Sequence, residues 1–274
     1  MSPSSPSSSA SQILSWLKPS TYAGGPANSV GMPWEIHRSP SLTPAHPHPV
    51  TLISKDGAAQ SYRSSLILVD EYGVGIVALT AGPMDVLPLL SAALVETFVP
   101  AVDEAARAHA ETQYARTFRS SPGKNESISA SFILDDDSMV ISSLERNGKD
   151  VLQGMVDIFN TTMGQFSSPM TTPFRIYPSV EMDARVTLPG CGNETTVIAE
   201  KWTVAPTLTD PTPASDLPGA GFWQDFCLGW TLGDWIHYGS EPLDRLIFYK
   251  NEEGEVLGFE APFLRSGLLR PVDE

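Results

Sequence analysis

Three consecutive apolar segments constrain the fold of this chain more than any other feature. They are residues 50–54, 64–70 and 74–80, and only Glu71, Tyr72 and Gly73 stand between the second and the third. So short a connection joins neighbouring antiparallel strands. The segments therefore predict an antiparallel meander. Because the apolar runs are nearly continuous, we expect its strands to be buried on both faces.

A helix is expected directly after this meander, from about Met84. Apolar side chains recur there at spacings of three and four, at Leu87, Leu90, Leu94 and Phe98. This spacing defines one apolar stripe, which can pack against the sheet. We expect Pro100 to kink or restart the helix, which then continues over residues 101–114.

The pattern changes after Phe118, where the helical period fades and short alternating segments with turns take over. The expected strands are 128–134, 139–144, 174–177, 184–188, 196–202, 246–250 and 256–261. We therefore predict an α+β chain in three parts. Residues 1–11 form a disordered Ser/Pro tail, residues 12–118 a sheet with a packed helix, and residues 119–274 a β-rich barrel or sandwich.

The charge and apolar content restrict the partners. The formal net charge is −15, which disfavours nucleic acid and anionic membrane surfaces. The longest apolar region, residues 86–106, is interrupted by Glu96, Pro100 and Asp103, so no membrane span is expected. The first domain supplies little to cover the second face of its sheet, which predicts a protein partner for that face.

The cysteines and glycosylation motifs leave the cellular location open. Cys191 and Cys227 could form one disulfide or remain two buried thiols. Sequons begin at Asn125, Asn160 and Asn193. They fit a secretory history but also arise by chance in Ser/Thr-rich chains. The N-terminus has no charged and apolar regions of a signal peptide, so none is expected.

The string Lys55-Asp56-Gly57 is followed by the hairpin of residues 64–80. This order resembles the serine β-lactamase, penicillin-binding protein and esterase superfamily, in which a Lys-Thr/Ser-Gly box, the third box, lies on the strand that edges the active site. Residues 16–19, 29–36 and 72–82 further resemble the closing portion of fungal β-lactamase-like proteins. Those proteins carry an extra C-terminal β-rich domain, and residues 114–118 and 128–151 are similar to its start.

The resemblance implies hydrolysis or acyl transfer at an amide, ester or lactone carbonyl. That chemistry uses a Ser-x-x-Lys motif at a helix start. The string Ser15-Trp16-Leu17-Lys18 has this spacing, but it stands too close before Lys55, and Pro19 fits a helix end. We therefore expect a truncated or split relative, not active alone as a serine hydrolase, in which Lys55 and Gly57 are vestigial third-box residues.

Asp56 departs from the family pattern, because threonine or serine is usual there. A carboxylate beside Lys55 could form an ion pair with it and repel a substrate carboxylate. The simpler interpretation, which we favour, is an exposed pair at the end of a strand with little energetic weight.

Five aromatic residues cluster near the end of the chain, at Phe222, Trp223, Phe226, Trp230 and Trp235. They could form a wall that binds a sugar or an apolar ring, in a repurposed protein that binds a small molecule or assists a cyclisation in secondary metabolism. The alternative, which we favour, is the core of the β-rich domain. His237, close to Asp234, is the best acid–base candidate of this half, although a satisfied, partly buried histidine is the simpler interpretation.

Metal sites are not expected, and neither is a cofactor. His46 and His48 could in principle clip a metal, but two histidines in a Pro-rich loop more simply lie in solvent. His37 is expected to be packed or capped after a short strand at residues 34–37. The run Asp135–Asp137 could hold a cation but fits a solvated turn better.

Overall fold

The computed structural model describes residues 12–13, 15–121, 126–163, 169–179, 184–189, 195–208, 234 and 236–272. Its contacts divide the chain into two compact units, Met1–Ala108 and His109–Glu274. The division falls inside helix α2 (Val86–Gln113), because this helix continues beyond the first unit. The sequence places the boundary somewhat later, at residues 119–124, where the composition changes.

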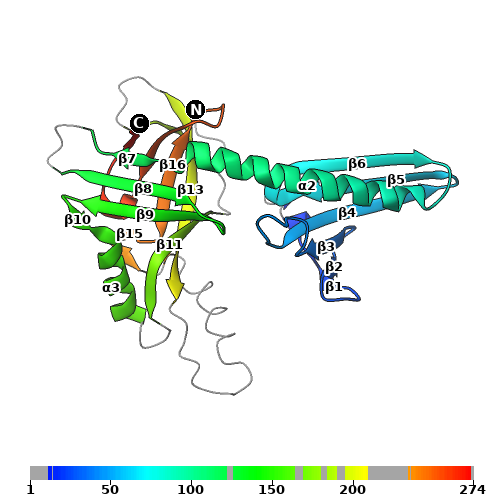
Figure 1. Cartoon of the computed structure of the whole chain (residues 1–274), viewed down its shortest axis with the longest axis horizontal. Coiled ribbons are helices and arrows are strands. Elements are labelled where there is room, and N and C mark those ends of the chain that lie inside the picture. Colours follow the sequence, from blue (N-terminus) through cyan, green and yellow to red (C-terminus); the bar gives the residue numbers. More distant parts are fainter. Residues whose placement is uncertain are drawn as a thin grey trace, which may run out of the picture. The chain divides into compact units, whose positions relative to one another are not determined.

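The first unit contains a six-stranded antiparallel sheet whose strands follow one another in chain order (Figure 1). The strands are β1 (Thr21–Tyr22), β2 (Asn28–Val30), β3 (Glu35–Ser39), β4 (Val50–Ala59), β5 (Tyr62–Val69) and β6 (Val74–Ala81). The predicted meander is therefore confirmed and gains three short strands before it. A 3-10 turn, Asp70–Tyr72, joins β5 to β6 and ends at Gly73, whose φ of 63° is readily adopted by glycine.

Helix α2 packs against one face of this sheet. Val95 and Val99 of the helix form a buried cluster with Ile67 of β5 and Ile76 of β6. The predicted helix is confirmed, but its buried face differs from the predicted stripe, because Leu90 and Phe98 are 37% and 51% exposed. The opposite face is covered near Ile53 by residues of the N-terminal segment. Toward β6, however, Val77 and Leu79 are 63% and 73% exposed. The prediction of burial on both faces is therefore wrong, because the described residues cover only part of the second face.

Pro100 lies within α2 without interrupting it. The expectation of a restart is therefore wrong; buried contacts of Val99 before the proline and Asp103 after it hold one continuous helix. By length and composition alone, α2 could also cross a membrane. The sequence analysis did not predict such a span. In this structure its side chains Leu87, Val95 and Val99 are buried.

The second unit is a nearly closed antiparallel barrel. Its strands follow the order β17-β16-β13-β11-β9-β8-β7-β18. They are β7 (Thr117–Arg119), β8 (Ile128–Leu134), β9 (Met139–Arg146), β11 (Met170–Pro178), β13 (Thr196–Leu208), β16 (Arg245–Lys250), β17 (Val256–Glu260) and β18 (Arg270–Pro271). Two backbone hydrogen bonds between Phe259 and Leu269, of 2.9 and 2.8 Å, join the two ends of this order. The fold is therefore mostly β, and the predicted β-rich second half is a barrel.

Smaller elements flank the barrel strands. They are β10 (Lys149–Asp150), β12 (Ala184–Thr187), β14 (His237–Tyr238), β15 (Glu241–Pro242) and the 3-10 turn Pro262–Leu264. A hairpin turn lies at Asn147-Gly148, where both residues have positive φ, 53° and 71°.

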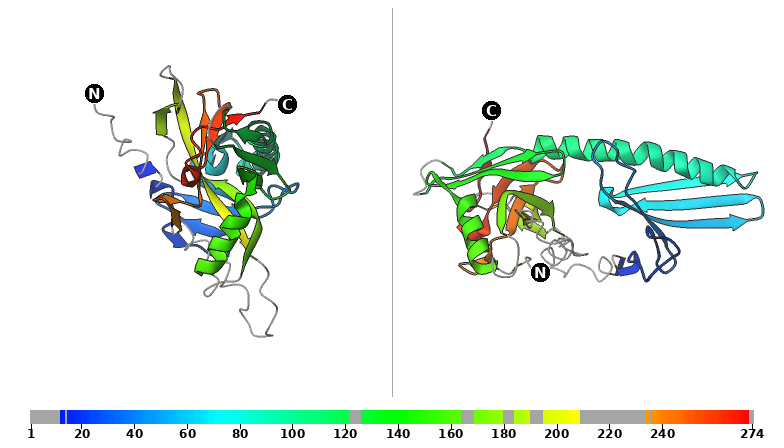
Figure 2. Two further views of the ribbon diagram at one scale, coloured as in Figure 1. Left: turned by 90° about the vertical axis from the view of Figure 1, so that its left-hand side faces the viewer. Right: turned by 60° about the horizontal axis from the view of Figure 1, so that its bottom comes forward.

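Helix α3 (Val151–Met163) was not predicted from the sequence. The carboxylate of Asp150 caps its start by accepting hydrogen bonds from the backbone N–H groups of Leu152 (2.8 Å) and Gln153 (3.3 Å). The helix lies beside β9 and β11 (Figure 2). It adds Leu152, Met155 and Phe159 to the barrel core, at the spacings of three and four that could have revealed it.

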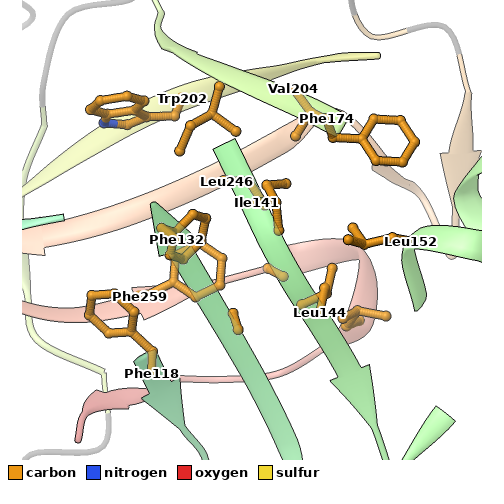
Figure 3. Close-up of a cluster of buried hydrophobic side chains, with 14 of the residues drawn as sticks. Phe118, Phe132, Ile141, Leu144, Leu152, Phe174, Trp202, Val204, Leu246 and Phe259 are labelled. Carbon is orange, nitrogen blue, oxygen red and sulfur yellow. The ribbon is translucent and has the colours of Figure 1, made fainter. Parts of the chain in front are cut away.

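Aromatic side chains fill the interior of the barrel (Figure 3). The ring centroid of Phe132 lies 5.2 Å from that of Phe248 and 5.0 Å from that of Phe259. Phe118 contacts the same rings at 5.9 and 5.7 Å. Among the described residues, the centre of the barrel is therefore a packed core.

Candidate functional site

The Lys-x-Gly string lies in the middle of β4, an interior strand between β3 and β5. Side chains alternate between the faces of a strand, so Lys55 and Gly57 share one face and Asp56 takes the other. Asp56 is opposite Ser65 of β5, on the face that α2 covers. Lys55 is opposite Leu66 and therefore lies on the face away from α2, which we call the open face. The sequence predicted a strand over residues 50–54 with Lys55 at its end, but β4 extends to Ala59.

Gly57 allows a close approach on the open face. A Cβ atom at this position would lie 2.7 Å from the hydroxyl oxygen of Ser64, the cross-strand neighbour. Around this pair lies a hollow of about 340 Å³, lined by Gly57, Ala58, Ala59, Tyr62, Arg63, Ser64, Leu79 and Thr80. A side chain at position 57 would therefore have to displace the Ser64 hydroxyl.

Lys55 forms an ion pair with Glu35 of β3, with Nζ 2.5 Å from Oε1. The ion pair of Lys55 is therefore with Glu35 and not with Asp56, the partner that the sequence suggested. Glu35 was not singled out in the sequence, since it becomes a neighbour only through the β3–β4 pairing. Both side chains are about half exposed, 42% for Lys55 and 54% for Glu35. The Glu35 carboxylate therefore neutralises the charge of Lys55.

The described hydrogen bonds of Ser15 do not involve Lys55. It lies in a short exposed helical stretch, and the backbone N–H of Lys18 donates to its carbonyl at 3.4 Å. Within the described ranges, no hydrogen bond joins the Ser15 hydroxyl to Lys18 or Lys55. A second string of this spacing, Ser121-Pro122-Gly123-Lys124, was missed; it falls in the connection between the paired strands β7 and β8, and residues 122–124 lie outside the described residues.

Several sequence candidates lie outside the described residues. These are Phe222, Trp223, Phe226, Trp230, Trp235, Cys191, Cys227, Asn125 and Asn193. The remaining sequon residue, Asn160, is described: its amide donates to the carbonyl of Met170 (3.0 Å) and accepts from the N–H of Met170 (2.7 Å). Its glycosylation stays a prediction.

The histidines take structural positions. His37 is exposed, and its Nδ1 lies 2.7 Å from Asn28 Oδ1, so the expectation that it is packed is wrong. His48 joins a network instead of lying free in solvent. Its Nε2 lies 2.9 Å from the Tyr72 hydroxyl, which donates to buried Asp103 at 2.9 Å. Burial and the hydrogen bond to Asp103 raise the pKa of Tyr72.

His237 is exposed, and Asp234 binds Arg245 (2.9 Å). No histidine–aspartate pair is therefore formed at this acid–base candidate within the described residues. The described residues also contain no group of three or more His, Cys, Asp or Glu side chains arranged to hold a metal ion.

An arginine binds the acidic run of residues 135–137. Arg175 donates to Asp135 at 2.8 and 2.9 Å and to Asp137 at 3.0 Å. The hydrogen bond from Arg175 lowers the pKa of Asp135 to about 2. The guanidinium therefore takes the place that a bound cation would need.

The barrel contains a partly buried carboxylate, Glu200, that the sequence did not reveal. Glu200 accepts hydrogen bonds from Lys250 (2.8 Å), the Tyr114 hydroxyl (2.6 Å) and the Trp202 indole (3.0 Å). Burial opposes ionisation, but these three donors hold the pKa of Glu200 below its ordinary value. Because both carboxylate oxygens accept hydrogen bonds, this cluster stabilises the barrel.

Comparison with known proteins identifies the family. Residues 106–272 match the family model described as "Beta-lactamase-like-like, C-terminal domain", and the chain belongs to this family. The resemblance to fungal β-lactamase-like proteins is thereby confirmed.

Three fungal relatives extend the match over nearly the whole chain. The "Beta-lactamase-like protein" of Arthroderma benhamiae is 32% identical over 94% of this chain and 44% of its own length. The "Probable hydrolase clz13" of Cochliobolus lunatus is 28% identical over 97% of this chain and 41% of its own length. The "Probable hydrolase M10" of a Phoma species is 29% identical over 91% and 40%. The chain thus spans less than half the length of these relatives. No solved structure matches it.

Proposed function

We propose that the open face around Lys55 and Gly57 is the third-box wall of an acyl-transfer site, in a relative of serine β-lactamase-like hydrolases. The reaction class of the parent site is hydrolysis or acyl transfer at an amide, ester or lactone carbonyl. The observation that carries this proposal is the placement of Lys55 and Gly57 on one face of an interior strand, beside the hollow at Ser64.

We infer that the described residues do not by themselves form the nucleophile of such a site. A serine nucleophile needs a base within hydrogen-bond reach. Ser15 has no such contact with Lys18 or Lys55 in the described structure, and Lys55 is paired with Glu35. The chain alone is therefore inactive as a serine hydrolase, and a partner segment supplies the attacking group.

A chimera tests the wall directly. The chain replaces the matched C-terminal segment of the Arthroderma benhamiae relative, and acylation by a chromogenic β-lactam and a p-nitrophenyl ester is followed by stopped flow. We expect the chimera to react, and Lys55→Ala to slow acylation at least tenfold, about 1.4 kcal/mol in the barrier. Asp56→Ala, on the other face, is the matched control and leaves the rate unchanged. An unreactive chimera, or equal rates with and without Lys55, would contradict the proposal.

The second candidate function, binding of a small apolar or glycosidic ligand in the β-rich unit, depends on Trp223, Trp230 and Trp235. The described part of the barrel does not favour it, since aromatic side chains fill its centre.

A further inference from the structure

A hydrogen-bond network joins the Pro-rich connection between β3 and β4 to helix α2. In this connection, His48 has its Nε2 atom 2.9 Å from the hydroxyl oxygen of Tyr72, and that hydroxyl donates to Oδ1 of Asp103 at 2.9 Å. The side chain of Asp103 is only 8% exposed. Its one ion-pair partner in the described chain is His48, whose Nε2 lies 4.0 Å from Oδ1.

The proton of the Tyr72 hydroxyl determines what the neighbouring histidine nitrogen can do. A phenol has one proton to donate, and an ionised carboxylate can only accept, so Asp103 takes this proton. Burial and the hydrogen bond to Asp103 raise the pKa of Tyr72, so the hydroxyl keeps its proton. The Nε2 atom of His48 can therefore bond to the Tyr72 oxygen only as an N–H donor.

The other ring nitrogen of His48 also faces oxygen atoms that accept. Its Nδ1 lies 2.8 Å from the backbone carbonyl oxygen of His46, which has no proton to give. The Thr43 hydroxyl lies 3.2 Å from Nδ1 and donates its own proton to the backbone carbonyl of His48 at 3.4 Å. Nδ1 is therefore a donor as well. A neutral imidazole has only one N–H group, and two donors require the imidazolium.

We propose that His48 is doubly protonated in the folded chain and makes the His48–Tyr72–Asp103 network a proton-dependent contact with α2. The imidazolium supplies the counter-charge that a buried carboxylate needs. When the ring loses a proton, Nε2 and Asp103 compete for the single proton of Tyr72, and one of them loses its hydrogen bond. While Asp103 is ionised, the network therefore stabilises the first unit, and this contribution is lost as the pH rises through the titration of His48.

The other titratable groups near the network favour the same charge on the histidine. Glu71, which precedes Tyr72 in the 3-10 turn, accepts a hydrogen bond from the backbone N–H of Thr51 at 2.9 Å and adds a second negative charge near the phenol. His46 takes part through its backbone carbonyl. On α2, the carboxylate next to Asp103 belongs to Glu104, which is exposed. None of these groups belongs to the proposed acyl-transfer wall, so this inference does not rest on the proposed function.

Nuclear magnetic resonance of the nitrogen-15-labelled full chain counts the ring protons directly. His37 is the internal reference, because it is exposed and its Nδ1 is hydrogen-bonded to an uncharged amide, that of Asn28. His48→Gln assigns the signals of His48. At the pH at which half of the His37 rings are protonated, we expect roughly ten protonated His48 rings for each neutral one, the effect of one hydrogen bond to a charged group.

Two variants on α2 form a matched pair. Asp103→Asn keeps an acceptor for Tyr72 but removes the charge, and His48 should then titrate together with His37. Glu104→Gln removes the neighbouring exposed carboxylate and should leave His48 unchanged. Titration of His48 together with His37 in the wild type would overturn the inference, and this comparison needs no variant to fold. So would a protonated His48 that persists in a folded Asp103→Asn variant, or one that is lost in Glu104→Gln.

Discussion

The ammonium of Lys55 lies 2.5 Å from the carboxylate of Glu35, across the pairing of β3 with β4. Lys55 is therefore paired with a residue on the neighbouring strand and not with the adjacent Asp56. In the proposed site, this counter-charge would reduce the need for a carboxylate on the substrate.

Removing this ion pair should have little effect on the fold. Both side chains are about half exposed, and exposed pairs contribute roughly 0–1 kcal/mol. We expect Glu35→Ala to change the free energy of unfolding by less than about 1 kcal/mol, measured by urea denaturation. A loss of several kcal/mol would show that the pair supports the sheet.

Gly57→Ala should lower the free energy of unfolding because of a contact with Ser64, and Ser64→Ala should remove this effect. The new methyl group would meet the Ser64 hydroxyl, 2.7 Å away, and displacing that side chain from its rotamer costs about 0.5–1.5 kcal/mol. In a Ser64→Ala background the same change should carry no such cost. A double-mutant cycle in urea measures this coupling, and additive effects would refute the contact.

The Asp135–Arg175 pair predicts a specific pH dependence. The folded pKa of Asp135 is lowered to about 2, below the unfolded value of about 3.9. Its contribution to stability is therefore fully present above about pH 4 and is lost as the pH falls toward 2. We expect the difference in unfolding free energy between wild type and Asp135→Asn to shrink over that window.

Urea denaturation at several pH values gives this difference. Arg175→Gln is the control background, in which the difference should be smaller, because only the backbone N–H groups of Asp137 and Ser138 then hold the carboxylate. A constant difference across the acid range in the presence of Arg175 would contradict the assignment.

Tyr114→Phe should destabilise the barrel. The hydroxyl donates a 2.6 Å hydrogen bond to the partly buried Glu200, and hydrogen bonds to charged groups contribute about 1.5–3 kcal/mol. Tyr238→Phe is the control, since Tyr238 is exposed, and it should leave the unfolding free energy unchanged. Equal, small effects of the two substitutions would show that Glu200 does not need this donor.

Local patterns in the sequence were sufficient for the central meander. The short connection at residues 71–73 and the apolar runs on either side specify a hairpin, and β5 and β6 form it with Gly73 in the left-handed region. Strand β8 has the predicted bounds, because its alternation matches the period of a strand that faces a core on one side.

Contacts between distant residues were not predictable in this way. Glu200 gains its donor from Tyr114, and the barrel ends meet at Phe259 and Leu269. These contacts depend on which strands pair and in which register, which no local pattern contains. Helix α3 is different: its apolar spacing was present in the sequence but was not weighed against the surrounding β pattern.

The most direct test of the central claim is the mass of the intact chain after incubation with a serine-directed acylating probe. The account predicts an unmodified chain, because no described serine is paired with a base on the wall that carries Lys55. A stoichiometric adduct on Ser15 that disappears in Lys18→Ala or Lys55→Ala would show a working nucleophile within this chain and contradict the account.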